Sequence, residues 1–226
     1  MTTYGQFCPV AKAMELLDER WTLLVVRELL MGSRRFNDLR RGVPRMSPAL
    51  LSKRLRTLQL AGVVQRCRRG DRVTYALTDA GEELRPVVEA LGRWGTRWVP
   101  ELGDQDLDPH LLLWDMHRNL DLDALPGERT VLHFRFPDVP RPAAWWWLVV
   151  DAGAVDVCDA DPGQPVTVTI TAPLRTLTDL WRGELTWPAA AHRGLRVDGP
   201  QWARRAVPRW FRLSAFAPVP RPGASA

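Results

Sequence analysis

The chain has 226 residues, enough for two domains, and 46% of them are hydrophobic, so we expect a sizeable core. The net charge of +5 is unevenly distributed: residues 1–100 hold 18 basic and 10 acidic residues, whereas residues 101–226 hold 13 and 16. A basic first half joined to a slightly acidic second half predicts that only the first half meets a polyanion.

Three widely spaced cysteines give no disulfide framework and no Cys/His zinc motif. The N-terminus lacks the charged and apolar regions of a secretion signal, and the longest apolar run, residues 143–150, is too short to cross a bilayer. We therefore expect a reduced, cytoplasmic protein with no membrane partner. His110 and His117 are two helical turns apart without a third ligand between them, so we predict no metal and no cofactor.

Residues 9–18 and 21–31 have the apolar spacing of helices, with Pro9 suited to a first turn and Gly32 to a helix end. The next stretch, residues 35–61, predicts a short helix, a break at Gly42 and Pro44, and a longer helix.

In the longer helix, residues 47–61, Ser47 provides an N-terminal cap and Pro48 fits the first turn. Leu51, Leu55 and Leu58 form one apolar stripe. Small, hydroxyl and cationic residues on the other side are what a major-groove recognition helix needs, although an ordinary amphipathic helix with a solvated basic face has the same pattern. The DNA contacts predicted in this region are Arg35, Ser47, Pro48, Ala49, Ser52, Lys53, Arg54 and Arg56, with Arg54 at the edge of the outward face.

After Gly62 the period becomes two, which predicts strands at residues 63–68 and 72–77 joined by a turn at 69–71. A hairpin directly after a helix pair is the order of a winged helix, with the wing at residues 66–73. We expect Arg68, Arg69 and Arg72 to contact phosphates or the adjacent minor groove, the alternative being a merely soluble hairpin tip.

A further helix is predicted from Thr78 to Trp98, and its apolar stripe is longer than a small winged helix can cover. We expect part of it to pack against a second subunit or against the helix at 9–18. A homodimer also suits the reading of two half-sites on double-stranded DNA.

Residues 7–98 resemble an HxlR-type winged helix-turn-helix transcriptional regulator. The residues that carry the resemblance are Cys8-Pro9-Val10, Arg20-Trp21-Thr22, Arg35-Phe36-Asn37-Asp38-Leu39, Met46-Ser47 through Leu51 and Leu55 to Leu58, Gly62-Val63-Val64, Tyr75-Ala76-Leu77-Thr78 and Gly81. Residues 48–50 depart from the family pattern, which usually has longer polar residues there. The resemblance implies a dimer built from the terminal helices, and in some members a cysteine matching Cys8 that senses oxidants or electrophiles.

Cys8 itself lies just before a predicted helix start, a position that permits a redox role. The alternative is a small buried residue at the dimer interface.

Residues 100–109 form an acidic linker without periodicity. A helix at 110–120 follows, then alternating segments at 129–136, 144–150, 154–160 and 166–171, a helix from Pro173 to Gly183, a short helix at 187–192, a short strand at 195–197 and a helix at 201–211. This order predicts an α+β domain with an antiparallel sheet and helices at 110–217, followed by a disordered tail at 218–226.

This second domain resembles the sterol-carrier-protein fold, which is known for a hydrophobic tunnel between sheet and helices. The resemblance rests on Val149-Val150-Asp151-Ala152-Gly153, Asp161-Pro162-Gly163, Leu180-Trp181-Arg182-Gly183-Glu184-Leu185 and Leu195-Arg196-Val197-Asp198-Gly199. Trp145 and Trp147 share one face of their strand and Trp146 takes the other. We predict Trp145, Trp147, Trp181 and Trp210 as contacts for an apolar or aromatic small-molecule effector, the alternative being that they only fill the core and interfaces.

Together these patterns predict a dimeric bacterial DNA-binding regulator, with residues 1–99 binding DNA and 110–217 sensing a ligand. No catalytic motif is present, so an enzyme is not expected. Two alternatives stay open: a regulator that senses oxidants or electrophiles through Cys8, and a ligand carrier that keeps the winged helix only for dimerisation.

Overall fold

The computed structural model describes residues 3–99 and 102–221. The chain divides into two compact units, Met1–Gly95 and Thr96–Ala226, and each has a hydrophobic core of its own. No helix in the described parts of the chain is long and apolar enough to span a membrane.

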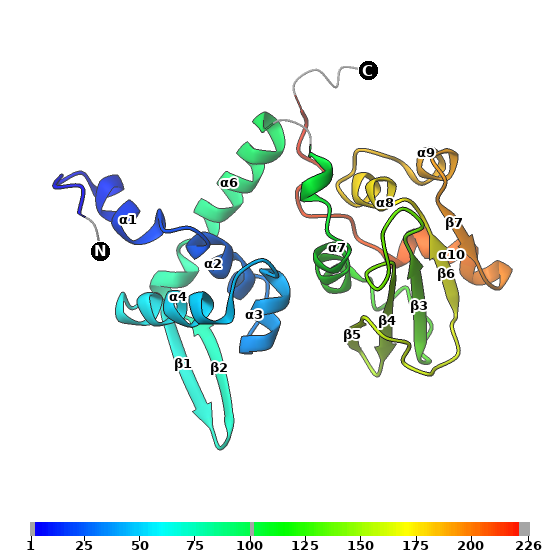
Figure 1. The fold of residues 1–226 in the computed structure, drawn as a ribbon, viewed down its shortest axis with the longest axis horizontal. Coiled ribbons are helices and arrows are strands. Elements are labelled where there is room, and N and C mark those ends of the chain that lie inside the picture. Colours follow the sequence, from blue (N-terminus) through cyan, green and yellow to red (C-terminus); the bar gives the residue numbers. More distant parts are fainter. Residues whose placement is uncertain (1–2, 100–101, 222–226) are drawn as a thin grey trace. The chain divides into compact units, whose positions relative to one another are not determined.

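Unit 1 contains six helices and one hairpin within its described residues (Figure 1). In chain order they are α1 (Pro9–Leu17), α2 (Thr22–Leu30), α3 (Phe36–Gly42), α4 (Pro48–Leu60), β1 (Val64–Arg69), β2 (Arg72–Leu77), α5 (Asp79–Glu82) and α6 (Arg85–Trp98), the last of which runs into unit 2. The core joins α2, α3, α4 and the base of the hairpin, which projects from the helices as a narrow wing.

One predicted helix is interrupted. The sequence pattern predicted a continuous helix from Thr78 to Trp98, but α5 ends at Glu82 and α6 begins at Arg85. Pro86 explains the break, because a proline has no backbone N–H to donate and is tolerated only in the first turn of a helix.

The first element that lies wholly in unit 2 is a 3₁₀ turn, η1 (Asp104–Asp106), inside the segment predicted as a linker. The other elements are α7 (Pro109–Met116), η2 (His117–Asn119), β3 (Thr130–Arg135), β4 (Trp145–Asp151), β5 (Ala154–Cys158), β6 (Val168–Thr171), α8 (Leu174–Trp181), α9 (Trp187–His192), β7 (Arg196–Asp198) and α10 (Gln201–Trp210). The strands form one sheet in the order β5-β4-β3-β6-β7.

The predicted antiparallel sheet is wrong at one pair, because β3 and β6 run parallel. The β3–β4–β5 meander is antiparallel, but the chain then returns through residues 159–167 and adds β6 on the other side of β3. Thr167 anchors this return at the start of β3, where its N–H donates to the Val131 carbonyl over 2.8 Å. The sheet is therefore mixed.

The core of unit 2 lies on one face of this sheet. Even-numbered residues of β3 and β4, such as Leu132, Phe134 and Leu148, pack with side chains from α7, α8, α9 and α10. The core cluster contains no odd-numbered residue of β3 or β4, so those side chains lie on the opposite face of the sheet. We call that opposite face the second face.

The predicted disordered tail is ordered where the structure describes it. Arg221 forms an ion pair with Glu184 at 2.7 Å, and the N–H of Val219 donates to the Phe216 carbonyl over 3.0 Å. Residues 222–226 of the predicted tail lie outside the described residues.

Candidate nucleic-acid interface

Helix α4 has a well-defined start and an inner and an outer side. The Ser47 hydroxyl accepts a hydrogen bond from the Leu50 N–H over 3.3 Å, and Pro48 occupies the first turn. Leu51, Leu55 and Leu58 are buried in the core of unit 1. The helix is thereby held on its leucine side, and its outer side faces solvent. The exposed residues on that outer side include Ser47, Pro48, Ala49, Ser52, Lys53 and Arg56.

Arg54 does not belong to this exposed set, contrary to the sequence-based expectation. Its side chain is only 7% exposed and forms an ion pair with the carboxylate of Glu19. Its Nε also donates to the Arg20 carbonyl over 3.2 Å. Arg54 therefore ties α4 to the turn between α1 and α2, and we assign it a structural role.

A buried carboxylate sets the packing of α2 against α3. Glu28 is 1% exposed; it pairs with Arg27 at 2.8 Å and accepts a hydrogen bond from the Ser33 hydroxyl over 3.1 Å. The same Arg27 guanidinium donates to the carbonyl of Gly42, the last residue of α3. A β-carbon at Gly42 would lie 1.9 Å from the Glu28 carboxyl carbon, so the close approach of the two helices requires glycine there.

The wing is a six-pair antiparallel ladder that runs from Val64 opposite Leu77 to Arg69 opposite Arg72. Gly70, which has a φ of 57°, and Asp71 form its two-residue turn. At the base, the N–H of Tyr75 donates to the Arg34 carbonyl over 2.8 Å, which joins β2 to the residue just before Arg35. The wing is therefore fixed to the helix pair at one end only.

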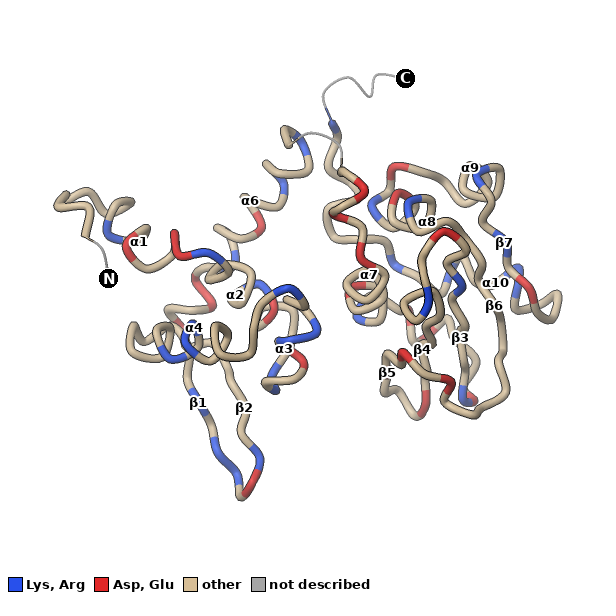
Figure 2. The backbone as a smooth tube through the Cα atoms, viewed as in Figure 1, with Lys and Arg blue, Asp and Glu red and all other residues tan. Residues whose placement is uncertain are grey.

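Cations line the exposed part of the wing and the outer side of α4 (Figure 2). Arg35, just before α3, and Lys53, Arg56, Arg69 and Arg72 are exposed, and within residues 3–99 and 102–221 none of their side chains has a carboxylate partner. Arg68 is exposed as well, and the only hydrogen bond of its side chain within those residues is the donation from its Nε to the Gly70 carbonyl. Unpaired guanidinium and ammonium groups on one set of adjoining elements can bind phosphates without first breaking an ion pair.

Arg66 was missed by the sequence reasoning. It lies on β1 opposite Tyr75 and is exposed. Because side chains two residues apart point to the same side of a strand, Arg66 and Arg68 share a face of the wing. That period-two relation was available in the sequence.

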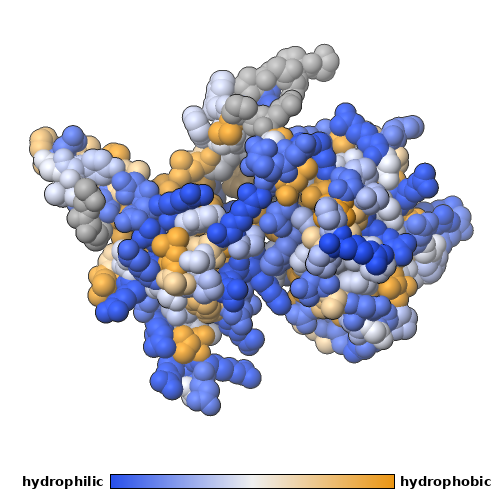
Figure 3. All heavy atoms as spheres, in the orientation of Figure 1, coloured by the Kyte–Doolittle hydropathy of each residue, from blue (hydrophilic) through white to orange (hydrophobic). Residues whose placement is uncertain are grey.

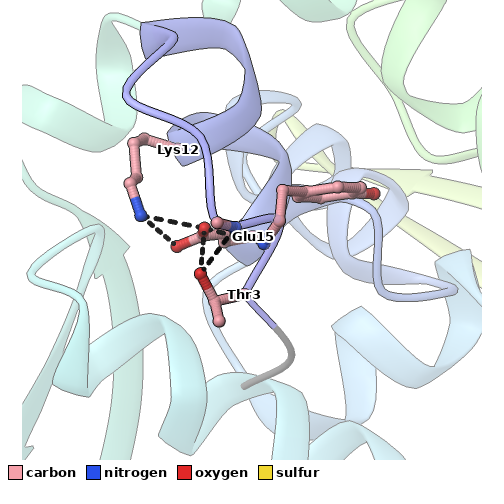
Figure 4. Close-up of polar contacts among 5 residues, drawn as sticks. Thr3, Lys12 and Glu15 are labelled. Atoms are coloured by element: carbon pink, nitrogen blue, oxygen red, sulfur yellow. Dashed lines mark hydrogen bonds and ion pairs between the residues drawn. The ribbon is translucent and has the colours of Figure 1, made fainter.

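Cys8 lies directly before α1, and its side chain is partly exposed and free of a disulfide. The segment before it folds back onto α1 (Figure 4). Glu15 accepts hydrogen bonds from Lys12 Nζ over 2.9 Å and from the Thr3 hydroxyl over 2.8 Å, and these bonds lower the pKa of the Glu15 carboxyl. Tyr4 donates its hydroxyl to Asp18 over 2.6 Å, which raises the pKa of the phenol.

The four tryptophans predicted as ligand contacts lie in two separate environments. Trp181 and Trp210 belong to the core cluster; Trp181 Nε1 donates to Asp115 Oδ2 over 2.8 Å, and Trp210 is fully buried. Trp145 and Trp147 lie on the second face of the sheet. Since a sheet separates the pairs, the four residues do not form one site. No group of three or more His, Cys, Asp or Glu side chains in the described residues could hold a metal ion.

Comparison with known proteins places the similarity in the first half of the chain. The model of the family described as HxlR-like helix-turn-helix matches residues 16–102. An HTH-type transcriptional regulator of Bacillus subtilis, YvaP, is 39% identical over 99 residues, which cover 42% of this chain and 92% of that protein. A regulator of the same type from Synechocystis, sll1512, is 37% identical over 100 residues, covering 43% of this chain and 74% of that protein.

Among solved structures, the reduced form of the Bacillus subtilis transcriptional regulator YodB is 30% identical, with a TM-score of 0.38; the match covers 44% of this chain and all of that one. The identity to YvaP over nearly its whole length, together with the matching family model, establishes that this chain belongs to the HxlR-like helix-turn-helix family.

Proposed function

We propose that the protein is a bacterial transcriptional regulator that binds double-stranded DNA as a homodimer. In this proposal α4 enters the major groove and the β1–β2 wing contacts the backbone or the adjacent minor groove. Membership of the HxlR-like family and the names of YvaP and sll1512 support regulation of transcription.

The observation that carries the DNA-binding role is the division of α4 into two sides. Its leucines are buried, while Ser52, Lys53 and Arg56 are exposed and the two cations have no carboxylate partner in the described residues. A hydroxyl and two long cationic side chains on a rigid helix suit hydrogen bonding to base edges and phosphates. Arg35, Arg66, Arg68, Arg69 and Arg72 are the proposed backbone contacts.

The proposed dimer interface consists of α1 and α6. Neither helix contains a buried residue, yet both expose large apolar side chains. Figure 3 shows hydrophobic surface in this region of unit 1. On α6, Val87, Leu91, Trp94 and Trp98 recur at helical spacing and are each 43% to 59% exposed; on α1, Val10 is 69% exposed. A helix with an uncovered apolar stripe gains most of its stability by packing, so a second copy of these helices is the proposed cover.

A second candidate for control of DNA binding is Cys8. Its thiol is partly exposed at the start of α1, beside the proposed dimer interface. Oxidation or alkylation there would change the packing of α1 and thereby the spacing of the two α4 helices. The primary proposal for control remains a small molecule bound in unit 2, the part that resembles the sterol-carrier-protein fold.

The experiment is fluorescence anisotropy with labelled DNA from upstream of the protein's own gene, over a salt series and against a random duplex. We expect a steep loss of affinity with salt and a preference of about 10³-fold or more for the native duplex. The double variant Lys53→Ala/Arg56→Ala should remove the preference. The matched control is Arg204→Ala/Arg205→Ala, which removes two exposed arginines from α10 in unit 2 and should leave binding unchanged.

Equal binding of both duplexes by the unaltered protein would contradict a specific operator in that region and favour the carrier alternative. Full affinity in the Lys53→Ala/Arg56→Ala variant would show that α4 is not the recognition helix.

A further inference from the structure

We propose that the second face of the unit 2 sheet is a binding site for a planar aromatic anion, such as an aromatic carboxylate, and that this ligand is the effector. The inference rests on the proposed regulatory function and gives that function a location and a ligand class. It also differs from a tunnel between sheet and helices, because the core side chains of α7, α8, α9 and α10 pack on the opposite face of the sheet.

The centre of the site is His133 on β3. Its side chain is 8% exposed, and its Nε2 is buried without a hydrogen-bond partner in the described part of the chain. Buried polar atoms in folded proteins are nearly always paired, because an unpaired one loses its bond to water without replacement. A ligand oxygen or N–H next to Nε2 would supply the missing partner.

Two indoles flank this imidazole; Trp147 is only 4% exposed, so Trp145 provides the accessible aromatic surface. His133 stacks on Trp147 with ring centres 4.7 Å apart and an angle of 2° between the planes. Trp145 meets His133 edge-on at 5.9 Å and is only partly buried. A flat ring can stack on Trp145 with one edge toward His133.

Arginines occupy one end of the second face. The guanidinium carbons of Arg135 and Arg141 lie 5.4 Å and 3.8 Å from the centre of a Trp145 ring. In the strand register Arg135 pairs with Thr171, and Thr171 pairs with Arg196. The α-carbons of Arg135 and Arg196 are therefore about 10 Å apart, a distance that their side chains can span. All three arginines are exposed, and none has a carboxylate partner among residues 3–99 and 102–221.

The acidic residues of this face orient the ligand. Asp161 is close enough to His133 to act on its charge, and Asp198 pairs with Thr169, which is the register partner of His133. Asp198 is thus at the level of His133, whereas Arg135 and Arg196 lie two residues further along their strands, at the level of Trp145. The anionic group is therefore placed at the arginine end and the ring over Trp145.

Binding uses side chains that can move. Arg141 lies in the connection between β3 and β4 and is exposed, so it can leave the indole when a ligand ring takes its place. Its guanidinium, together with that of Arg135, then forms charge-assisted hydrogen bonds with the ligand carboxylate. Recognition thus requires both a flat ring and a negative charge.

The test uses the full-length protein with 2-naphthoate as the probe and 2-naphthalenemethanol as its uncharged counterpart. Binding is followed by calorimetry and by quenching of tryptophan fluorescence. We expect saturable binding of about one naphthoate per chain. The alcohol should bind with an affinity at least about tenfold lower than that of naphthoate. Arg135→Ala/Arg141→Ala should weaken naphthoate binding by about tenfold or more and leave the affinity for the alcohol nearly unchanged.

Two control variants match these changes elsewhere in unit 2. Arg204→Ala/Arg205→Ala removes the same charge from α10, and Trp202→Phe removes an exposed indole from the same helix. Neither should alter naphthoate affinity. Absence of saturable binding up to about 1 mM, or equal affinity in Arg135→Ala/Arg141→Ala, would overturn the site.

Anisotropy with the upstream DNA, with and without naphthoate, separates this inference from the proposed function. A naphthoate-dependent shift in DNA affinity that disappears in Arg135→Ala/Arg141→Ala supports the effector role, and unchanged DNA affinity at saturating naphthoate overturns it. If the protein binds DNA specifically but does not bind naphthoate, only this inference is overturned. If it binds naphthoate but does not bind DNA specifically, the proposed function is overturned.

Discussion

The guanidinium of Arg54 on α4 pairs with the carboxylate of Glu19, a residue 35 positions earlier in the chain. Arg54 is almost fully buried, while the Glu19 side chain is half exposed at 50%. The pair connects the proposed recognition helix to the turn before α2, so it controls the orientation of α4 without being available to DNA.

The first prediction concerns this pair. Replacing Arg54 with Met keeps the apolar stem but removes the guanidinium, and we expect unit 1 to lose about 1–2 kcal/mol of unfolding free energy, since one partner is half exposed and screened. Glu19→Gln should cost a similar amount or more, because it leaves a buried cation without its carboxylate. Urea denaturation monitored by circular dichroism measures both.

The DNA-binding control for the same pair is the salt dependence. If Arg54 makes no phosphate contact, Arg54→Met leaves the slope of log affinity against log salt concentration unchanged, whereas Lys53→Ala/Arg56→Ala lowers it. A reduced slope in Arg54→Met would show that Arg54 reaches the DNA after all.

A second prediction follows from Gly42. An alanine there would place its β-carbon against the buried Glu28 carboxylate, which Arg27 and Ser33 hold in position. We expect Gly42→Ala to destabilise unit 1 by about 2–4 kcal/mol, the range of overpacking with loss of a buried polar network. Thermal or urea unfolding provides the measurement, and Gly127→Ala is the control because a β-carbon at Gly127 meets nothing within 4 Å.

A double-mutant cycle identifies the cause of the Gly42 effect. Glu28→Ala removes the carboxylate that the new methyl group would meet, so the cost of Gly42→Ala should be smaller in the Glu28→Ala background than in the natural sequence. Additive costs would locate the strain elsewhere in α3.

The sequence could predict those parts of this structure that depend on local patterns, such as the buried leucines of α4. The helices, the wing and the outward position of Lys53 and Arg56 follow from local periodicity and from Gly and Pro signals, which a single stretch of chain contains. The helix break before α6 also had a local signal, Pro86, that was not used.

Long-range relations had no such signal. The ion pair of Arg54 depends on Glu19, which lies in the turn between α1 and α2. The periodicity of α4 alone leaves Arg54, at the edge of the helix, undecided between the core and solvent. The parallel pairing of β6 with β3 depends on where the chain goes after β5. The separation of Trp145 and Trp147 from Trp181 and Trp210 becomes visible only when the helices are assigned to one face of the sheet.

A third prediction uses His133. Burial lowers the pKa of its imidazole below the usual value of 6.5, and the nearby charge of Arg135 acts in the same direction. The unfolded chain therefore binds a proton that the folded chain excludes, so the unfolding free energy of unit 2 falls as the pH drops through about 6.5 toward the lower folded pKa. Above the unfolded pKa this contribution to the pH dependence vanishes.

The variant His133→Phe tests that assignment. It keeps an aromatic ring against Trp147 but cannot take up a proton, so its melting temperature should fall less between pH 7.5 and pH 5 than that of the natural protein. Unfolding is followed by near-ultraviolet circular dichroism, to which the tryptophans of unit 2 contribute. Equal pH dependence in the two proteins would assign the effect to other titrating groups.

The last prediction separates the two DNA-binding elements of unit 1. The cations of the wing have exposed, flexible side chains and surround a turn, which suits contact with phosphates, whereas the outer side of α4 is rigid and suits contact with bases. Arg68→Ala/Arg69→Ala should therefore weaken binding to the native and random duplexes by a similar factor and reduce the magnitude of the salt slope by about two units. Ser52→Ala/Lys53→Ala should instead weaken binding to the native duplex selectively, by about tenfold or more, because lost base contacts affect only the specific complex.

Anisotropy titrations of both variants against both duplexes measure the four affinities. If the wing variant lost selectivity and the α4 variant did not, the wing and not α4 would read the sequence, and the assignment of α4 to the major groove would have to be abandoned.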